Sequence, residues 1–218
     1  MTKAEIIKKV VDVGVVPVVR AASAAQAIAA AEAVCAGGIS VVEVTMTVPG
    51  AVEVIAQLVK TLGSAVVVGA GTVLDAGSAR RCLDAGAQFL VSPGFDLETV
   101  KFANSQGVPM MAGALSPTEV ITAWNAGSDF VKIFPCGNVG GAKYIKALKG
   151  PLPQIPMIPT GGVNLNTAAE FIQAGSAAVG VGGELVLAAA LKSGNTREIT
   201  ELAKQYVTVV REARAAKV

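Results

Sequence analysis

One local pattern recurs along the chain: a helical segment ends at a glycine, and a short β-branched run follows. Glycine is favoured just past a helix end because the left-handed conformation costs it little. The β-branched runs are almost wholly apolar, as in parallel strands that are covered on both faces. The pattern therefore predicts strands alternating with helices around a parallel sheet. The clearest helix ends are Cys35-Ala-Gly-Gly, Asp84-Ala-Gly-Ala, Asn125-Ala-Gly-Ser and Gln173-Ala-Gly-Ser.

The spacing of the strands decides between two kinds of parallel sheet. Neighbouring strand ends lie roughly 20 to 28 residues apart, which is enough for one strand and one helix each. Eight such units fit a closed barrel better than an open doubly wound sheet, which more often has five or six strands. We therefore expect an α/β fold of the (β/α)8 TIM-barrel type. The predicted strand ends are Arg20, Thr45, Thr72, Ser92, Ala112, Lys132, Thr160 and Gly182.

Two further helices frame the predicted barrel. Residues 2–13 place apolar and charged side chains at helical spacing and stop near Gly14, so an extra amphipathic helix precedes the first strand. Residues 196–216 form a closing helix. The chain has 218 residues, of which 52% are hydrophobic, and no linker interrupts it. We expect a single domain, with the leading helix over 1–14 and the barrel over 15–218.

Composition excludes several classes of function. The net charge is only +2 and the basic residues are scattered, so no surface for nucleic acid or membrane binding is predicted. The chain has no histidine, and Cys35, Cys82 and Cys136 stand far apart, which argues against a zinc site and a histidine-dependent triad. We expect no metal and no cofactor. The amino terminus has no apolar leader and no apolar run could span a bilayer, so a cytoplasmic location is predicted.

The run Phe130-Val131-Lys132-Ile133-Phe134-Pro135 places a lysine inside a strand that should be buried. An unpartnered ammonium group is costly to bury, and burial favours the neutral amine, a nucleophile that can condense with a ketone. Lys132 falls near the end of the sixth strand, and active sites of such barrels lie at the carboxyl ends of the strands. Lys132 is therefore a candidate covalent catalyst.

Glu43 is a second isolated charge, inside the predicted second strand. It shares a strand face with Thr45 and Thr47, and if that face points inward, Glu43 and Lys132 approach each other at the barrel mouth. The pair is either a buried ion pair without a chemical role or an amine catalyst with its proton-transfer partner. We favour the second interpretation, because buried pairs add little stability and no histidine is available. Asp129 lies at the opposite strand end and is interpreted as structural.

Glycine-rich turns follow several predicted strands. Thr160-Gly161-Gly162 and Gly180-Val181-Gly182-Gly183 follow strands seven and eight, where barrels commonly bind phosphate through backbone N–H groups. The alternative is that these are ordinary turns whose glycines permit close packing. Arg20, at the end of strand one, could add a cation for a carboxylate or a phosphate.

Taken together, these stretches resemble the family of class I 2-dehydro-3-deoxy-phosphogluconate aldolases, including the 4-hydroxy-2-oxoglutarate aldolases. The resemblance implies a (β/α)8 barrel, usually trimeric, that uses no metal. It implies Lys132 as the Schiff-base lysine and Glu43 as the general acid–base residue, with Thr72, Pro93, Phe134, Thr160 and Gly161-Gly162 bordering the substrate. The matching stretches are Glu43-Val44-Thr45, Gly69-Ala70-Gly71-Thr72-Val73, Val91-Ser92-Pro93-Gly94, Phe130–Pro135 and Pro159-Thr160-Gly161-Gly162-Val163.

Two positions depart from the pattern of the family. Many members carry an arginine for the pyruvate carboxylate where this chain has Thr47, which shifts carboxylate binding to hydroxyls, amides and Arg20. Many also carry a serine in the last phosphate turn, where this chain has Gly183 followed by Glu184. Both departures bear on substrate preference, and neither touches the covalent chemistry.

The predicted reaction is reversible cleavage of 2-dehydro-3-deoxy-6-phosphogluconate to pyruvate and glyceraldehyde 3-phosphate, with 4-hydroxy-2-oxoglutarate, which gives pyruvate and glyoxylate, as a second substrate. The expected partners are a small, phosphorylated 2-oxo acid and two further copies of the chain in a homotrimer. The predicted substrate contacts include Gly182 and Gly183 of the last turn. Two alternatives remain: a phosphosugar isomerase, epimerase or synthase on the same barrel, and a non-catalytic oligomeric barrel.

Overall fold

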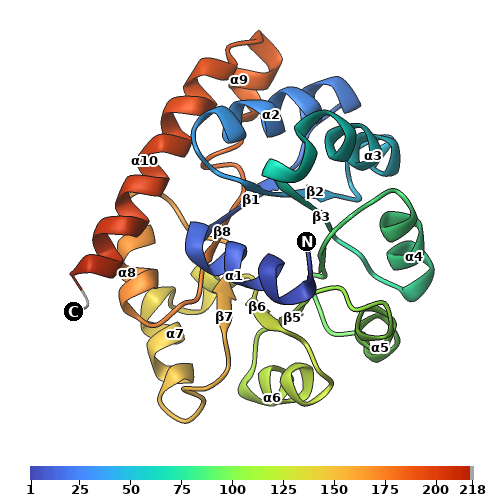
Figure 1. Ribbon diagram of the computed structural model, residues 1–218. Helices are drawn as coiled ribbons and strands as arrows, with labels where there is room; N and C mark the ends of the chain where they lie inside the picture. Colours follow the sequence, from blue (N-terminus) through green and yellow to red (C-terminus); the bar gives the residue numbers. More distant parts are fainter. Residues whose placement is uncertain (217–218) are drawn as a thin grey trace.

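The computed structural model, which describes residues 1–216, confirms the predicted (β/α)8 barrel. Its eight strands pair in parallel in the order β7-β6-β5-β4-β3-β2-β1-β8. A bridge between Thr160 and Gly180 joins the two outer strands and closes the ring (Figure 1). The strands are β1 Val15–Val19, β2 Val41–Thr45, β3 Val67–Gly71, β4 Leu90–Val91, β5 Met110–Ala114, β6 Phe130–Ile133, β7 Met157–Pro159 and β8 Val179–Val181.

Helices surround the strands on the outside, and their ends follow the predicted glycine pattern (Figure 1). Gly38, Gly86, Gly127 and Gly175, just past four of the helices, have φ of 95°, 95°, 94° and 104°, a region that other residues avoid. The helices are α1 Lys3–Val13, α2 Ala24–Ala36, α3 Ala51–Leu62, α4 Ala76–Asp84, α5 Leu97–Ser105, α6 Pro117–Asn125, α7 Ala142–Lys149, α8 Ala168–Gln173, α9 Ala188–Ser193 and α10 Thr196–Ala215, with short 3₁₀ turns at Gly63–Ala65 and Cys136–Val139.

One strand end differs from its prediction. β5 was expected to stop near Ala112 but continues through Gly113 to Ala114. Gly113 stays in the strand because the chain beside it leaves no room for a side chain: a Cβ there would lie 2.2 Å from the Pro93 carbonyl carbon. The glycine therefore permits close strand packing and does not end the strand.

The interior of the barrel is filled with apolar side chains at its amino end. Ile6 and Val10 of the predicted leading helix α1 belong to the same buried cluster, so the helix closes this end of the barrel. Figure 1 shows α1 lying across the ring of strands. The rest of the cluster consists of Val16, Val41, Val67, Phe89, Val91, Met111, Phe130, Ile158 and Ala178.

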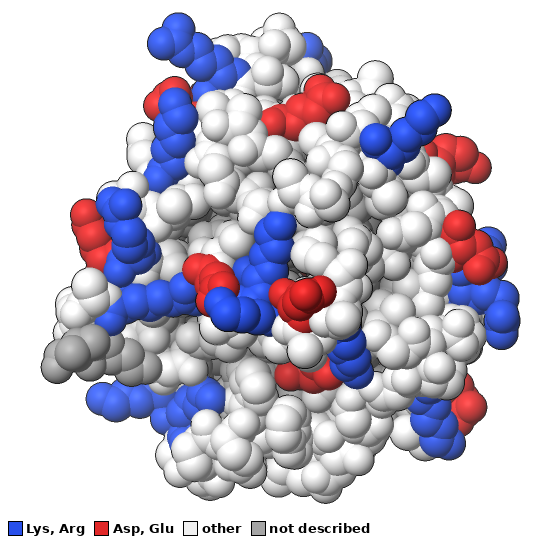
Figure 2. All heavy atoms as spheres, in the orientation of Figure 1, with Lys and Arg blue, Asp and Glu red and all other residues white. Residues whose placement is uncertain are grey.

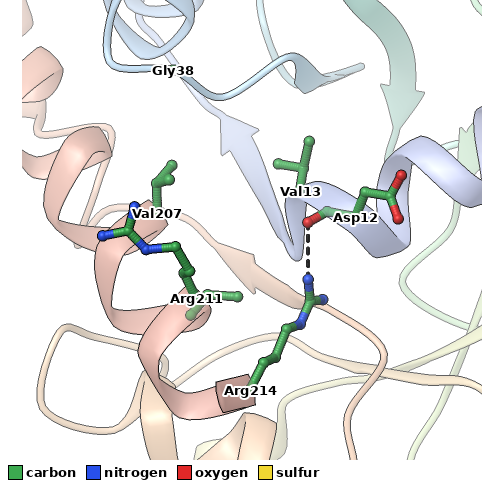
Figure 3. A pocket seen from close by; sticks show the side chains of 7 residues that line it. Asp12, Val13, Gly38, Val207, Arg211 and Arg214 are labelled. Atoms are coloured by element: carbon green, nitrogen blue, oxygen red, sulfur yellow. Dashed lines mark hydrogen bonds between the residues drawn. The ribbon is translucent and has the colours of Figure 1, made fainter.

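Polar contacts hold α1 in this position. Lys3 Nζ lies 3.0 Å from Asp129 Oδ2 and 3.2 Å from Asn104 Oδ1, so Asp129 has the structural place expected of it. At the other end of α1, Arg214 of α10 donates to the carbonyl of Asp12 at 2.9 Å (Figure 3) and also to that of Val11. The guanidinium thus satisfies carbonyls at a helix C-terminus that has no basic residue of its own. A hollow of about 280 Å³ lies between these two helices.

The surface carries no dominant charge on the face seen in Figure 2, where acidic and basic side chains are interspersed. Among residues 1–216, no helix combines the length and the apolar character that crossing a membrane requires. The same part of the chain holds no cluster of three or more Cys, Asp or Glu side chains that could bind a metal ion.

Candidate active site

The inner face of the barrel changes character two residues further along β3, β5 and β8. Val67, Met111 and Ala178 fill the amino end, and the next inward positions on the same strands are Gly69, Gly113 and Gly180. At Gly180, a Cβ would lie 2.2 Å from Thr160 Oγ1. Gly180 thus gives space to the Thr160 hydroxyl group, whereas Gly69 makes room for the Phe89 ring and Gly113 for the backbone at Pro93.

The structure brings Lys132 and Glu43 together at the carboxyl end of the barrel. Lys132 Nζ lies 3.8 Å from Glu43 Oε1, and their side chains are only 5% and 2% exposed. The amine also lies 5.5 Å from the centre of the Phe134 ring. Two ionisable groups are therefore held next to each other at the barrel mouth, where burial keeps bulk water from both.

The carboxyl group of Glu43 is suited to carrying a proton. Burial raises the pKa of Glu43, and the positive charges of Lys132 and Arg20 oppose the rise. Oε1 accepts no hydrogen bond from any described residue, so it is free to accept one from a ligand or a water molecule. Gly71 makes room for this oxygen, because a Cβ on Gly71 would lie 1.8 Å from it.

The hydroxyl groups beside Glu43 are engaged with each other. Thr45 donates to the carbonyl of Val19 at 3.0 Å, so the 2.7 Å contact between the Thr45 and Thr47 hydroxyls has Thr47 as the donor. Thr72 follows Gly71 and has a φ of 59°. It is the only residue other than glycine with a positive φ in the described chain. A β-branched residue in this conformation is strained, as is common where backbone lines a functional site.

A pocket of about 150 Å³ opens at the ends of β1, β6, β7 and β8, and Phe134, whose ring lies beside Lys132 Nζ, lines it, although Lys132 and Glu43 do not. It brings seven of the predicted substrate contacts together, whereas Thr47, Thr72 and Pro93 do not line it. Glu184 also lines the pocket. It was not among the predicted contacts, although in the sequence it is part of a departure from the pattern of the family. The lining consists of Val18, Arg20, Phe134, Thr160, Gly161, Gly162, Val163, Gly180, Gly182, Gly183 and Glu184.

Backbone amides add hydrogen-bond donors to the pocket. In the described part of the chain, the N–H groups of Gly162 and Gly183 donate no backbone hydrogen bond. Both glycines lie in turns that line the pocket, and Gly162 has a φ of 77° that suits glycine. Free amides of this kind, with Arg20 nearby, can bind an oxyanion.

Comparisons with known proteins agree on one family. A family model described as KDPG and KHG aldolase matches residues 6–202. A 2-dehydro-3-deoxy-phosphogluconate aldolase of Treponema pallidum is 36% identical over 91% of this chain and 94% of its own length. A KHG/KDPG aldolase of Escherichia coli K12 is 35% identical over 88% of this chain and 90% of its own.

A solved structure extends the similarity to three dimensions. A KDPG aldolase from Legionella pneumophila, with pyruvate captured as a covalent carbinolamine intermediate, is 34% identical and superimposes with a TM-score of 0.82. The match covers 90% of this chain and 96% of that one. On the combined sequence and structural similarity, the chain belongs to the KDPG and KHG aldolase family and is an aldolase, a member of the lyase class of enzymes.

Proposed function

We propose that Lys132 and Glu43 are the catalytic pair of this class I aldolase, Lys132 as the Schiff-base lysine and Glu43 as the general acid–base residue. The observation that carries the proposal is the 3.8 Å approach of the two buried groups at the mouth of the barrel, next to a pocket. A neutral amine attacks a ketone, and an adjacent carboxyl group moves the protons that the attack and the loss of water require. Among residues 1–216, Lys132 is the only lysine whose side chain is buried.

In the proposed mechanism, each step falls to one of the two groups. Lys132 Nζ attacks the C2 ketone of the substrate, and the carbinolamine loses water as Glu43 supplies a proton to the departing hydroxyl. The resulting iminium withdraws electrons as the C3–C4 bond breaks, and Glu43 takes the proton of the C4 hydroxyl. The enamine is then protonated at C3 and hydrolysed to release pyruvate. The raised pKa of Glu43 suits a group that must hold a proton and then accept one.

The substrate that fits the family is 2-dehydro-3-deoxy-6-phosphogluconate, which the reaction splits into pyruvate and glyceraldehyde 3-phosphate. The relatives named above are aldolases for this compound, and one carries KHG in its name as well, which makes 4-hydroxy-2-oxoglutarate the second substrate. Support comes from the free amides of Gly162 and Gly183 and from Arg20, which together offer a phosphate two kinds of donor, backbone N–H groups and a guanidinium. Thr47, Thr72 and Pro93 remain predicted contacts at the pyruvate end.

We further propose that the protein forms a homotrimer and works in the cytoplasm. Large apolar side chains stand exposed on the carboxyl side of the barrel and on its outer helices, with Leu74 61%, Leu97 41% and Ile121 41% accessible. Burying them against another copy would remove this apolar surface from water. A designed cage built from symmetric oligomeric domains contains a chain of the same fold, with 30% identity. Light scattering on the purified protein tests the trimer directly.

The lysine assignment has a direct chemical test. The protein is incubated with saturating pyruvate and borohydride, digested, and examined by mass spectrometry for a reduced adduct on Lys132. Lys132→Ala should lose the adduct and almost all turnover, whereas Lys143→Ala, on the exposed side of α7, should keep both. An unmodified Lys132 peptide from the wild-type protein would rule out the proposal and favour an isomerase or a non-catalytic barrel.

The glutamate assignment is tested by separating imine formation from turnover. Glu43→Gln keeps the shape of the side chain but holds no exchangeable carboxyl proton, so turnover should fall by about 10²–10⁴-fold. The pyruvate adduct on Lys132 should still form, only more slowly. Full turnover in Glu43→Gln would show that another group moves the protons.

A further inference from the structure

The pocket beside Lys132 is lined by two charged side chains of opposite sign. Arg20 follows β1, and Glu184 lies in the turn between β8 and α9. No other residue of the lining is ionisable, so the formal charges of the side chains that line the pocket sum to zero. Within residues 1–216, neither Arg20 nor Glu184 takes part in an ion pair.

Among residues 1–216, Glu184 has no hydrogen-bond partner that would commit its carboxylate elsewhere. Its charge contributes to the raised pKa of Tyr206 on α10, behind the larger effect of burial, so the carboxylate acts on that phenol through space. The Tyr206 hydroxyl is nevertheless without a hydrogen bond among the described residues. The acceptor oxygens of Glu184 therefore remain available to a ligand in the pocket.

The side chains of Arg20 and Glu184 together favour some ligands over others. A phosphate group is attracted by Arg20 and by the free amides but repelled by Glu184, because like charges brought close together disfavour binding. A chain of hydroxyl groups meets no such conflict. Each hydroxyl can donate to the carboxylate and accept from the guanidinium, so it can use both side chains at once.

We infer that Glu184 is a specificity-determining residue that opens the site to unphosphorylated, polyhydroxylated 2-oxo acids. The inference rests on the aldolase function proposed above. The carboxylate offsets the attraction of Arg20 for a phosphate and provides an acceptor for the terminal hydroxyls of the substrate. The enzyme thus cleaves 2-dehydro-3-deoxygluconate with an efficiency comparable to that for its 6-phosphate.

The test is a comparison of two substrates in three proteins. Pyruvate release gives kcat/KM for 2-dehydro-3-deoxygluconate and for its 6-phosphate in the wild type, in Glu184→Gln and in Glu170→Gln. Glu170 is the matched control: it is exposed on α8 near Gly162 and lines a neighbouring groove but not this pocket. Its loss changes the overall charge equally without changing the pocket.

In the wild type, the two kcat/KM values should agree within about tenfold. Glu184→Gln should raise kcat/KM for the phosphorylated substrate by about tenfold or more, because one like charge is removed. Its value for the unphosphorylated substrate should stay the same or fall, and Glu170→Gln should leave the ratio unchanged. A wild type that prefers the phosphorylated substrate by more than about tenfold, or a ratio that Glu184→Gln moves no further than Glu170→Gln, overturns the inference.

A binding measurement separates this inference from the aldolase function itself. Inorganic phosphate alone, titrated calorimetrically, should bind Glu184→Gln about tenfold more tightly than the wild type or Glu170→Gln. Equal affinities for all three proteins overturn the role of Glu184. A missing pyruvate adduct on Lys132 with the expected phosphate affinities would instead count against the aldolase proposal and leave the charge effect in place.

Discussion

The two ends of the barrel interior are built from the same strands but in opposite ways. At the amino end, strand residues such as Val67 and Met111 form one buried apolar cluster with Ile6 and Val10 of α1. Two residues after Val41 and Phe130 of this layer come Glu43 and Lys132, and Gly71 leaves room for the Glu43 carboxyl group. The apolar layer stabilises the fold, and the layer above it places charges where water is excluded. A strand period of two thus separates stability from chemistry within one short segment of chain.

The largest expected effect lies in the filled end. Met111 is 1% exposed, and Met111→Ala should lower the free energy of unfolding by about 2–5 kcal/mol through lost burial and a residual cavity. Urea denaturation measures the loss. The kcat of the folded enzyme should change less than about threefold, because no catalytic group moves. A large drop in kcat without loss of stability would show that the two ends are not separable.

The next largest effect lies at the open end of the barrel, where a substitution should lower activity and not stability. In Gly71→Ala the new methyl group would lie 1.8 Å from Glu43 Oε1, so the carboxyl group must move. Displacement of a catalytic group by about 1 Å can cost about 10²-fold in rate. Steady-state kinetics should show that loss in kcat. Gly94→Ala is the control, since a Cβ on Gly94 meets no atom within 4 Å, and it should keep its activity.

Much of this contrast could be predicted from residue types. The eight strand–helix units, the leading helix and the facing positions of Glu43 and Lys132 follow from periodicity, because a strand inside a barrel shows one face to the interior. The role of Asp129 followed in the same way, from its place at the start of a strand. These features depend on the local pattern of residues and on the order of the strands and helices, and both can be read from the sequence.

Features that depend on distances between strands could not be predicted. Gly113 was taken to lie beyond the end of β5, whereas it is a strand residue that makes room for the backbone at Pro93. The clash that any side chain on Gly71 would make with Glu43 requires the register of β2 and β3. Glu184 was noted only as a departure in the last turn, because its neighbour in the pocket, Arg20, lies far away in sequence.

A smaller effect concerns stability at the open end. Burial raises the pKa of Glu43 in the folded protein, so folding favours its protonated form. The contribution is complete below the unfolded pKa of about 4.3 and is lost as the pH rises through the folded value. Relative to Glu43→Gln, the wild type should therefore lose stability above about pH 4.5, by up to about 1.4 kcal/mol per pH unit.

Urea denaturation of both proteins between about pH 4.5 and pH 7.5 measures the difference in their free energies of unfolding. Titrating groups that the two proteins share contribute equally to both values and cancel in the difference. The exposed Glu53→Gln, on α3, controls for the loss of a carboxylate. A difference between wild type and Glu43→Gln that does not change with pH would mean that the carboxyl group ionises as easily in the folded protein as in the unfolded chain.

The smallest effect returns to the closed end. Lys3→Ala removes the ion pair with Asp129, whose side chain is only 14% exposed, and should cost about 1 kcal/mol. The cost stays small because Asp129 keeps its hydrogen bond from the Met110 amide at 2.9 Å and because α1 remains anchored by apolar burial. Lys8→Ala breaks only an exposed pair with Asp12 and should cost less than about 0.5 kcal/mol.

Kinetics on the same two variants sharpen the comparison between the ends. If α1 serves only to close the barrel, Lys3→Ala and Lys8→Ala should both keep the kcat and KM of the wild type, since neither lysine reaches the layer that holds Glu43 and Lys132. A fall in kcat confined to Lys3→Ala would mean that Asp129, at the start of β6, transmits the loss along the strand to Lys132. The apolar layer would then position the catalytic lysine as well as stabilise the fold.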